Sequence, residues 1–377
     1  MLRDWVEAFA QSVWVEPGNK GTWLLGLLKP LSVVYGGIQR IRRALYRAGF
    51  FPQRRLPCGV ISVGALRVGG SGKTPFVLWC CGRLAEKGVR PAILTRGYRR
   101  RSSLRTQILL HEQIDRLHPV ETGDEPYLLA KSLPGVPVVV DPDRYRGAYA
   151  VLGRRPVDVF VLDDGFQHLR LARDCDIVLI GDEMEEQALS CLPAGPLREP
   201  PGALQHAQAL VRFSGAGPAP SGSEGSRALK GPLSMSTSPL FCAEIQPIGF
   251  FTLDGQGPVD ASFLRGKEVL AFCGIGRPES FWLTLERMGI QVVLRESFPD
   301  HHWYAWKDFR RILRGLGASR WAVTTEKDAV KIARFPWPPG RMLFLRVAVQ
   351  MHDEERFWQV VFGCLGRPQD AEKSGRG

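Results

Sequence analysis

The segment from Val60 to Pro75 constrains the fold of this chain more than any other part of its sequence. An apolar run ending near Val63 predicts a buried strand, and it leads into a glycine-rich loop that closes on Gly72, Lys73 and Thr74. Glycine lacks a Cβ, so the loop backbone can curl around an anion, and the start of the following helix adds partial positive charge. Lys73 would reach the β- and γ-phosphates of a nucleotide, and the Thr74 hydroxyl would bind Mg²⁺. The expected nucleotide contacts are Gly69, Gly70, Ser71, Gly72, Lys73 and Thr74.

The loop departs from the full P-loop pattern at one position. That pattern has a glycine five residues before Gly72, where this chain has Arg67. A glycine-rich turn in an ordinary βα unit therefore stays open as the alternative. The nucleotide site is favoured because strand, loop and helix signals follow one another in the order that such a site needs.

A second chemical signal lies at 157–168, where an apolar strand pattern ends in Asp163 and Asp164. Strand-end carboxylates about ninety residues after a P-loop are placed to hold Mg²⁺ or its waters opposite the lysine and threonine of the loop. Taken alone, two aspartates at a strand end are a common turn signal. Gln167 or His168 could orient a ligand, and a structural histidine is the alternative for His168.

Two further segments carry groups suited to proton transfer. Asp124 and Glu125 stand at the start of a helical pattern, where carboxylates often serve only as caps. A phosphoryl-transfer enzyme also needs a group to accept the proton of the attacking hydroxyl, and a carboxylate suits that task. The Phe298 to Trp303 segment contains His301 and His302 without further ligands at metal spacing. We therefore expect a histidine that supports a carboxylate base.

Short apolar runs alternate with helical patterns, which predicts an α/β fold with a mostly parallel sheet and helices on both faces. At 377 residues the chain is long for one core, so we expect a P-loop NTPase-like core and a smaller C-terminal α/β domain. Two runs at 240–246 and 249–253 are expected to pair as a ribbon. The expected divisions are an N-terminal membrane-interface helical segment at 1–55, the P-loop core at 56–213, a linker or insertion with the ribbon at 214–255, the C-terminal domain at 256–366 and a disordered tail at 367–377.

The N-terminal region is basic. The chain has a net charge of +12, and no Asp or Glu occurs between residues 17 and 85. An apolar stretch at 22–38 is interrupted by Lys29 and Pro30, so it is too short and too broken to span a bilayer. Four arginines follow this stretch: Arg40, Arg42, Arg43 and Arg47. The pattern favours a helix lying in the interface of an anionic membrane over a packed helix or a nucleic-acid-binding arm.

Eight motifs occur in one order along the chain. They are Val-Gly-Gly-Ser-Gly-Lys-Thr-Pro at 68–75, Thr-Arg-Gly-Tyr at 95–98, Gly-Asp-Glu-Pro at 123–126, Asp-Arg-Tyr at 143–145, Leu-Asp-Asp-Gly-Phe-Gln-His at 162–168, Leu-Pro-Ala-Gly-Pro-Leu-Arg-Glu-Pro at 192–200, Phe-Pro-Asp-His at 298–301 and Thr-Thr-Glu-Lys-Asp at 324–328. With these motifs the chain resembles the tetraacyldisaccharide 4'-kinases, the lipid A kinases of Gram-negative envelopes, over roughly residues 20 to 365. The family usually has Gly-Asn before the loop, where this chain has Gly64 and Ala65.

The resemblance implies a peripheral enzyme on the cytoplasmic face of the inner membrane. Such an enzyme uses ATP and Mg²⁺ and moves the γ-phosphate to the 4'-hydroxyl of a tetraacylated glucosamine disaccharide 1-phosphate. Position by position, the resemblance implies that Asp124 is the general base, that His301 is its partner and that Lys73 acts on the nucleotide. The implied metal-facing groups are Thr74, Glu125, Asp163 and Asp164. The implied phosphate or substrate contacts are Arg144 and Arg198.

Two other classes of protein compete with this interpretation. A P-loop ATPase or switch that couples hydrolysis to partner binding at the membrane would have no evident use for Asp124 and His301. A basic nucleic-acid-binding NTPase is disfavoured because the chain lacks the interleaved aromatic and basic residues of a recognised reader module. The eight cysteines occur without a C-x-x-C pair, which favours buried thiols in a reducing cytosol. The expected partners are a glycolipid substrate and an anionic membrane surface, with no nucleic acid and no obligate protein partner.

Overall fold

The computed structural model describes residues 19–98, 100–181, 190–213, 236–318 and 320–366. The chain forms two compact units, each assembled from separated stretches of sequence. The first unit comprises Met1–Lys73, Asp158–Ala243 and Met351–Gly377, and the second comprises Thr74–Val157 and Glu244–Gln350. The sequential domains expected above stay a prediction. Most of the expected linker at 214–239 and the tail after residue 366 lie outside the described residues.

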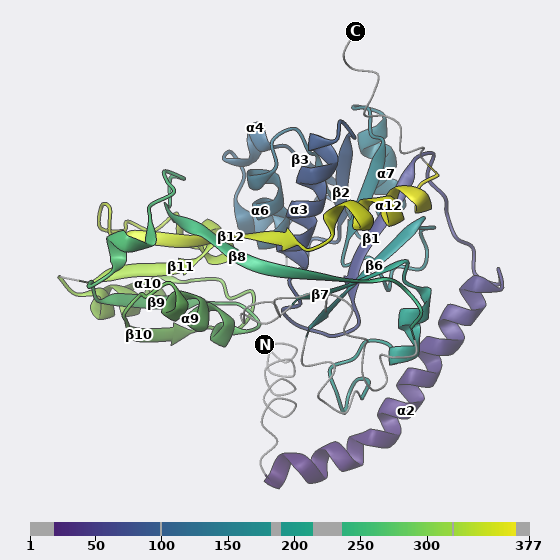
Figure 1. The fold of residues 1–377 in the computed structure, drawn as a ribbon, viewed down its shortest axis with the longest axis horizontal. Helices are drawn as coiled ribbons and strands as arrows, with labels where there is room; N and C mark the ends of the chain where they lie inside the picture. Colours follow the sequence, from purple (N-terminus) through teal and green to yellow (C-terminus); the bar gives the residue numbers. More distant parts are fainter. Residues whose placement is uncertain (1–18, 99, 182–189, 214–235, 319, 367–377) are drawn as a thin grey trace. The chain divides into compact units, whose positions relative to one another are not determined.

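The first unit is built on four parallel strands in the order β7, β6, β1, β5 (Figure 1). The strands are β1 (Gly59–Ala65), β5 (Val159–Asp163), β6 (Cys175–Gly181) and β7 (Ala209–Phe213). Almost every residue in them is buried, as expected for parallel strands that are covered on both faces. The first residues of β8 (Leu240–Thr252) add beside β7. The helix α12 (Glu354–Cys364) packs there through Phe357, whose ring meets the Phe241 ring edge-on.

The long helix α2 (Asn19–Arg47) also belongs to the first unit, and it confirms that the acid-free N-terminal region forms a helix. Ser32 ties the helix to the body of the unit, because its hydroxyl donates to the Cys191 carbonyl and accepts from the Ala194 N–H. Gly36 allows close approach, since a Cβ there would lie 3.3 Å from the Pro200 ring. Among the residues that the structure describes, no helix is both long and apolar enough to cross a bilayer.

The second unit contains two groups of strands. In one group, β2 (Pro91–Thr95) and β4 (Val138–Val140) are parallel, and β3 (Gln107–Leu109) runs antiparallel to β4. The other group is parallel, in the order β10, β9, β11, β12. Its strands are β9 (Val269–Cys273), β10 (Val292–Ser297), β11 (Trp321–Thr325) and β12 (Met342–Met351). The helices are α3 (Lys73–Glu86), α4 (His111–Ile114), α5 (Pro119–Thr122), α6 (Asp124–Ser132), α7 (Arg144–Leu152), α9 (Pro278–Arg287), α10 (Trp306–Leu316) and α11 (Glu326–Ile332).

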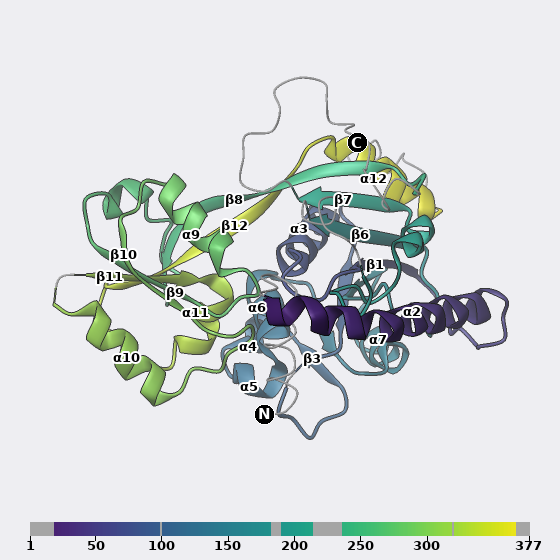
Figure 2. The same ribbon diagram turned by 90° about the horizontal axis from the view of Figure 1, so that it is seen from below.

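Side chains of β9 alternate between two cores, because successive residues of a strand point to opposite faces. Its odd-numbered residues join the core formed with α9, and its even-numbered residues join the core formed with α10. Helices therefore cover both faces of this sheet (Figure 2). The expected class, an α/β protein with a mostly parallel sheet and packed helices, is confirmed.

Three elements differ from the expectations. The runs at 240–246 and 249–253 do not form a ribbon, because β8 is one continuous strand. Pro247 lies in an exposed stretch of β8, where its missing N–H breaks no buried ladder. The sequence pattern also predicted a helix from Trp303 to Leu313, but α10 begins at Trp306, and Asp308 in its first turn accepts a hydrogen bond from the Ala305 N–H. The short helix α11 was not expected, although Thr325 caps it by accepting from the Asp328 N–H.

Candidate active site

The glycine-rich loop of the first unit joins β1 to α3, which confirms the expected strand, loop and helix. Gly69 and Gly72 have φ angles of 103° and 71°, which side chains disfavour, so glycine is needed at both positions. Lys73 opens the helix, and its ammonium donates to the Ser71 hydroxyl at 3.0 Å. The loop therefore has the backbone that a phosphate cradle requires.

Arg67, the departure from the P-loop pattern, has a structural reason. It forms an antiparallel bridge with Leu197, and the adjacent Val68 N–H donates to the Pro196 carbonyl at 2.9 Å. The Arg198 N–H donates to the Leu66 carbonyl at 2.7 Å. Because the backbone is extended at this bridge, position 67 needs no glycine. The motif at 192–200 lies along one side of the start of the loop.

The strand-end acids lie next to this loop within the first unit. β1 and β5 pair in a register that sets Asp163 opposite Val63. Asp164 has a left-handed φ of 53°, and Gly165 then turns back to donate its N–H to the Val63 carbonyl at 3.0 Å. A Cβ on Gly165 would lie 2.6 Å from Leu162, so the turn has no room for a side chain.

Asp164 is already bound to cations of the first unit. Arg198 Nη1 lies 2.6 and 2.8 Å from its two carboxylate oxygens, and Lys73 Nζ lies 3.7 Å from Oδ1. Two carboxylates and the Thr74 hydroxyl are hard oxygen donors, which is the ligand type that Mg²⁺ requires. In the described part of the chain, no cluster of three or more His, Cys, Asp or Glu side chains could hold a metal ion.

Asp124 and His301 meet inside the second unit. Asp124 is the buried first residue of α6, after Gly123 with a φ of 96°. His301 has a left-handed φ of 58°, and its Nδ1 lies 2.9 and 3.1 Å from the two Asp124 oxygens. The edge of the Tyr98 ring packs against the imidazole at 5.5 Å between centroids. The contact joins residues 177 positions apart, and it is the carboxylate–histidine pair expected from the sequence.

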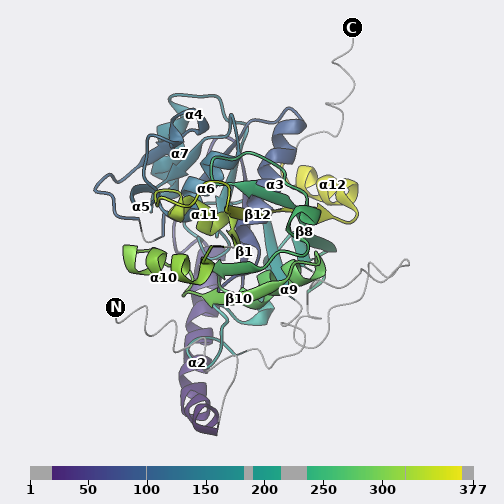
Figure 3. The ribbon, with the colours of Figure 1, turned by 90° about the vertical axis from the view of Figure 1, so that its left-hand side faces the viewer.

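Lys327 on α11 joins this cluster, although sequence reasoning did not single it out, and α11 lies beside α6 (Figure 3). Its ammonium lies 3.0 Å from Glu125 Oε1, 3.3 Å from Asp300 Oδ1 and 3.3 Å from His301 Nε2. An ammonium has donors only, so Nε2 accepts from it, and Nδ1–H donates to Asp124. The Thr-Thr-Glu-Lys-Asp motif contained Lys327, but nothing in its spacing indicated this role.

The charges in this cluster shift its pKa values. Burial alone would raise the pKa of Asp124, but Lys327 and the hydrogen bond from His301 lower it well below its usual range. Burial would lower the pKa of His301, but the hydrogen bond to Asp124 and the charges of Asp124 and Glu125 together outweigh burial and raise it. For Lys327, Glu125 and Asp300 outweigh burial and raise the pKa. Asp124 is therefore ionised at neutral pH.

The remaining predicted residues already have partners. Glu125, expected near the metal, pairs with Lys327. Arg144 is buried at the start of α7 and donates to the Pro142 carbonyl. His302 lies 3.0 Å from Asp308 at the start of α10, which gives it a structural role. Roles of Glu125 and Arg144 at the metal and the substrate stay predictions.

Only some of the arginines near the C-terminal end of α2 are free to contact a membrane surface. Arg43 is 6% exposed, and its guanidinium makes two 2.8 Å bonds to the Glu199 carboxylate. It also donates to the Phe166 carbonyl at 3.3 Å and lies over the Phe166 ring. Arg42 donates to the Gln167 carbonyl at 3.2 Å. These two arginines therefore bind the turn that follows Asp164, which corrects the expectation that all four arginines face a membrane.

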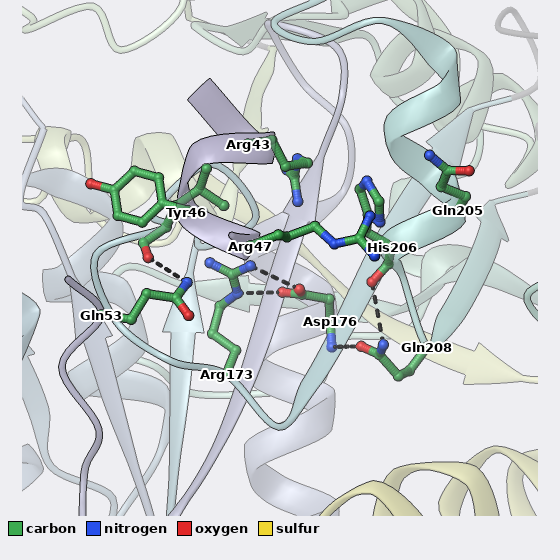
Figure 4. Close-up of a pocket in the computed structure, with 10 residues that line it drawn as sticks. Arg43, Tyr46, Arg47, Gln53, Arg173, Asp176, Gln205, His206 and Gln208 are labelled. Atoms are coloured by element: carbon green, nitrogen blue, oxygen red, sulfur yellow. Dashed lines mark hydrogen bonds and ion pairs between the residues drawn. The ribbon is translucent and has the colours of Figure 1, made fainter. Parts of the chain in front are cut away.

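A polar cavity of about 380 Å³ lies beside this end of α2 (Figure 4). Arg173 and Asp176 pair across it, and Gln208 accepts from the Asp176 N–H, so much of its lining is bonded internally. Burial lowers the pKa of His206 on the cavity wall, and the charges of Arg43 and Arg47 add to that shift. Arg40 and Arg47 are exposed.

Comparisons with known proteins agree with this geometry. The family model described as tetraacyldisaccharide-1-P 4'-kinase matches residues 24–365. A tetraacyldisaccharide 4'-kinase from Syntrophus aciditrophicus is 36% identical over 363 residues, which cover 94% of this chain and 97% of the relative. One from Alkalilimnicola ehrlichii is 40% identical over 325 residues, covering 86% and 88%. A crystal structure of LpxK from Aquifex aeolicus in complex with ATP is similar with a TM-score of 0.72 and 34% identity, covering 91% of this chain and 99% of that one.

Proposed function

The chain belongs to the tetraacyldisaccharide-1-P 4'-kinase family, and we propose that it transfers the γ-phosphate of ATP to the 4'-hydroxyl of a tetraacylated disaccharide 1-phosphate, a lipid A precursor. The substrate class follows from the names of the relatives, which match across most of the chain. The nucleotide follows from the glycine-rich loop and from the ATP complex of the similar LpxK structure.

The contact between Asp124 and His301 is the observation that best supports transfer of the phosphoryl group to a hydroxyl. Asp124 accepts the proton of the attacking 4'-hydroxyl, and His301 Nδ1–H orients the carboxylate through the 2.9 Å contact. Lys327 holds His301 in this tautomer through Nε2. A P-loop protein that only switches conformation needs no such proton acceptor.

The loop residues supply binding and charge neutralisation. The N–H groups of Gly69 to Gly72 and the Lys73 ammonium would bind the phosphates, and Thr74, Asp163 and Asp164 would hold Mg²⁺, with Glu125 as a further candidate. When bound, Mg²⁺ would neutralise charge that develops on the phosphoryl oxygens. Arg198 would exchange part of its contact with Asp164 for a phosphate oxygen, and Arg144 would contact the substrate.

The enzyme acts as a peripheral protein at the cytoplasmic face of the inner membrane, where its lipid substrate lies. Support comes from α2, which exposes one apolar stripe at helical spacing: Leu27, Leu31, Val34, Ile38 and Ile41. An exposed stripe of this kind is unusual on a soluble surface, and it suits a helix that lies in a lipid interface. Arg40 and Arg47 add attraction to anionic headgroups.

ATP consumption by the purified protein, measured with and without a glycolipid acceptor, tests the proposal. We expect turnover that requires a tetraacylated disaccharide 1-phosphate, with one phosphate transferred per ATP. Equal turnover without any acceptor would identify an ATPase or switch protein instead. A soluble disaccharide without acyl chains serves as the matched control for a lipid requirement.

A further inference from the structure

Lys331 places a positive charge in the interior of the second unit. Its side chain is 0% exposed. The centroid of the Tyr304 ring lies 5.6 Å from Nζ. Burial of an ammonium is costly unless opposite charges lie close to it. The charges that surround Lys331 therefore define its role.

Two carboxylates face Lys331. Asp328 Oδ1 lies 2.8 Å from Nζ and Asp124 Oδ2 lies 3.8 Å from it. Asp328 is itself fixed, because its Oδ2 accepts from the Gly274 N–H at 2.8 Å and from the Thr325 hydroxyl at 2.7 Å. The fixed Asp328 carboxylate therefore holds the Lys331 ammonium in a defined position, 3.8 Å from Asp124 Oδ2.

The other contacts of Asp124 come from different directions. Its Oδ1 accepts from the Glu125 N–H at 3.0 Å, and His301 Nδ1 reaches both oxygens. Lys331 adds a third contact at Oδ2, from α11. We propose that Lys331 is a positioning residue that holds the Asp124 carboxylate in the orientation needed to receive the proton of the 4'-hydroxyl. This inference rests on the proposed function of Asp124 as the general base.

The step itself is unchanged by this role. The 4'-oxygen forms a bond to the γ-phosphorus, the bond from that phosphorus to the bridging oxygen of ADP breaks, and the hydroxyl proton goes to Asp124. Lys331 is enclosed and touches none of the reacting atoms. Its loss should therefore lower kcat and leave the KM values for ATP and lipid unchanged.

Lys331→Met removes the charge at similar side-chain length. We expect kcat to fall roughly 10²-fold, as is typical when a catalytic group loses its orientation, and Lys331→Arg to recover part of the loss because the charge returns. Lys131→Met is the matched control. Lys131 lies near the C-terminal end of α6, the helix that begins with Asp124, and it forms an exposed pair with Asp115. The control should keep wild-type kcat.

A double-mutant cycle with Asp124→Asn separates positioning from general stability. If Lys331 acts through Asp124, Lys331→Met should change kcat less than about twofold in the Asp124→Asn background. The proposal is overturned if Lys331→Met folds and keeps its kcat, or if it lowers kcat equally in both backgrounds. Should Lys331→Met fail to fold, Lys331→Gln, which also removes the charge, replaces it in the same cycle under the same criterion.

The same set of variants distinguishes this inference from the proposed function. If Asp124→Asn itself keeps full kcat, the role of Asp124 as base is wrong, and the inference fails with it. If Asp124→Asn loses activity while Lys331→Met does not, the base assignment stands and only the positioning role is rejected.

Discussion

At the residue scale, the pair of Asp124 and His301 has the clearest consequence for kinetics. Alanine at either position should remove most of kcat while the affinity for ATP changes little, because the pair acts on the acceptor hydroxyl. The double variant should lose less than the sum of the two single losses, since each residue works through the other. Steady-state kinetics with nucleotide-binding measurements test this. Additive losses, or a change confined to ATP binding, would place Asp124 with the metal ligands.

Lys73 and Asp163 should act on the triphosphate and its metal. Lys73→Ala and Asp163→Ala are each expected to raise the activation barrier by at least ~2.7 kcal/mol without unfolding the protein, because they remove preorganised charge stabilisation. Single-turnover phosphoryl transfer and circular dichroism measure the two effects. Lys87→Ala, on an exposed lysine just after α3, is the matched control. Near-normal kcat in either site variant would argue against the phosphate-cradle assignment.

Asp141 provides a pH-dependent stability contact in the second unit. Its buried carboxylate accepts two bonds from Arg146, at 2.7 and 2.9 Å, and a bond from the Asp143 N–H at 2.7 Å. Burial would raise the pKa of Asp141, but the bonds from Arg146 and Thr106 outweigh burial and lower it. A carboxyl whose folded-state pKa is depressed contributes stability above its unfolded pKa of about 3.9, and the contribution is lost as the pH falls through the folded value.

Asp141→Asn should therefore lower the free energy of unfolding by about 2 kcal/mol at neutral pH. The gap between wild type and variant should stay constant from neutral to mildly acidic pH and shrink as the pH falls below about 4. Urea unfolding across a pH series measures it. Asp115→Asn, at an exposed carboxylate of the same unit, should show little change at any pH. A gap independent of pH would show that the charge of Asp141 contributes nothing.

Sequence reasoning found some site residues and missed others for a physical reason. Lys73, Asp124 and His301 stood in motifs whose spacing matches a known chemistry. Lys327 and Lys331 act through their charge on other side chains, and nothing local distinguishes them from the exposed lysines of an ordinary helix. Their partners come from α6 and from a loop far away in the sequence, so only the folded structure reveals them.

At the element scale, Arg43 anchors α2 rather than serving as a lipid contact. Arg43→Gln would leave the Glu199 carboxylate buried without its cation, and it should cost about 3–5 kcal/mol of stability. Arg47→Gln, one turn later and exposed, should change stability by less than about 0.5 kcal/mol. Denaturant unfolding compares the two variants. Equal stability of both would mean that the buried pair contributes nothing to holding α2.

Local patterns predicted the elements best where apolar residues and turn signals agreed. The patterns predicted strands at 91–95 and 209–213 and a helix at 124–132, and β2, β7 and α6 have these bounds. β8 was divided in two because Pro247 and Gly249 normally interrupt strands, but the exposed stretch of β8 tolerates Pro247. α11 was missed because it follows β11 with no intervening loop, so that its capping residues read as the end of a strand.

At the scale of the whole molecule, each compact unit combines segments from distant parts of the chain. Sequence periodicity reports local structure, and it carries little information on which distant strands pair. The class of fold was therefore predictable, whereas the return of the last helix, α12, to the strand β7 was not. The same limit applies to Lys327 and Lys331, whose contacts with Glu125 and Asp124 no local pattern indicated.

Membrane binding is also expected of the whole molecule, and the exposed residues of α2 are the ones to substitute in a test of it. The exposed stripe of α2 offers five apolar side chains, each worth on the order of 1 kcal/mol if half of it enters the lipid, and Arg40 and Arg47 add about 1 kcal/mol each near an anionic surface. Serine at Leu31, Val34 and Ile38 should shift the enzyme from anionic liposomes to the supernatant and raise the KM for lipid, with the KM for ATP unchanged. Gln at Arg40 and Arg47 should weaken binding in a way that added salt reproduces.

The matched control for these variants is Leu283→Ser, which removes an exposed leucine from α9. It should pellet with liposomes like the wild type. The interface assignment requires that α2 variants release the enzyme while they stay folded, and thermal unfolding checks that condition. If pelleting is insensitive to the stripe, to the two arginines and to salt, α2 does not bind lipid, and its exposed apolar stripe must be covered by another surface.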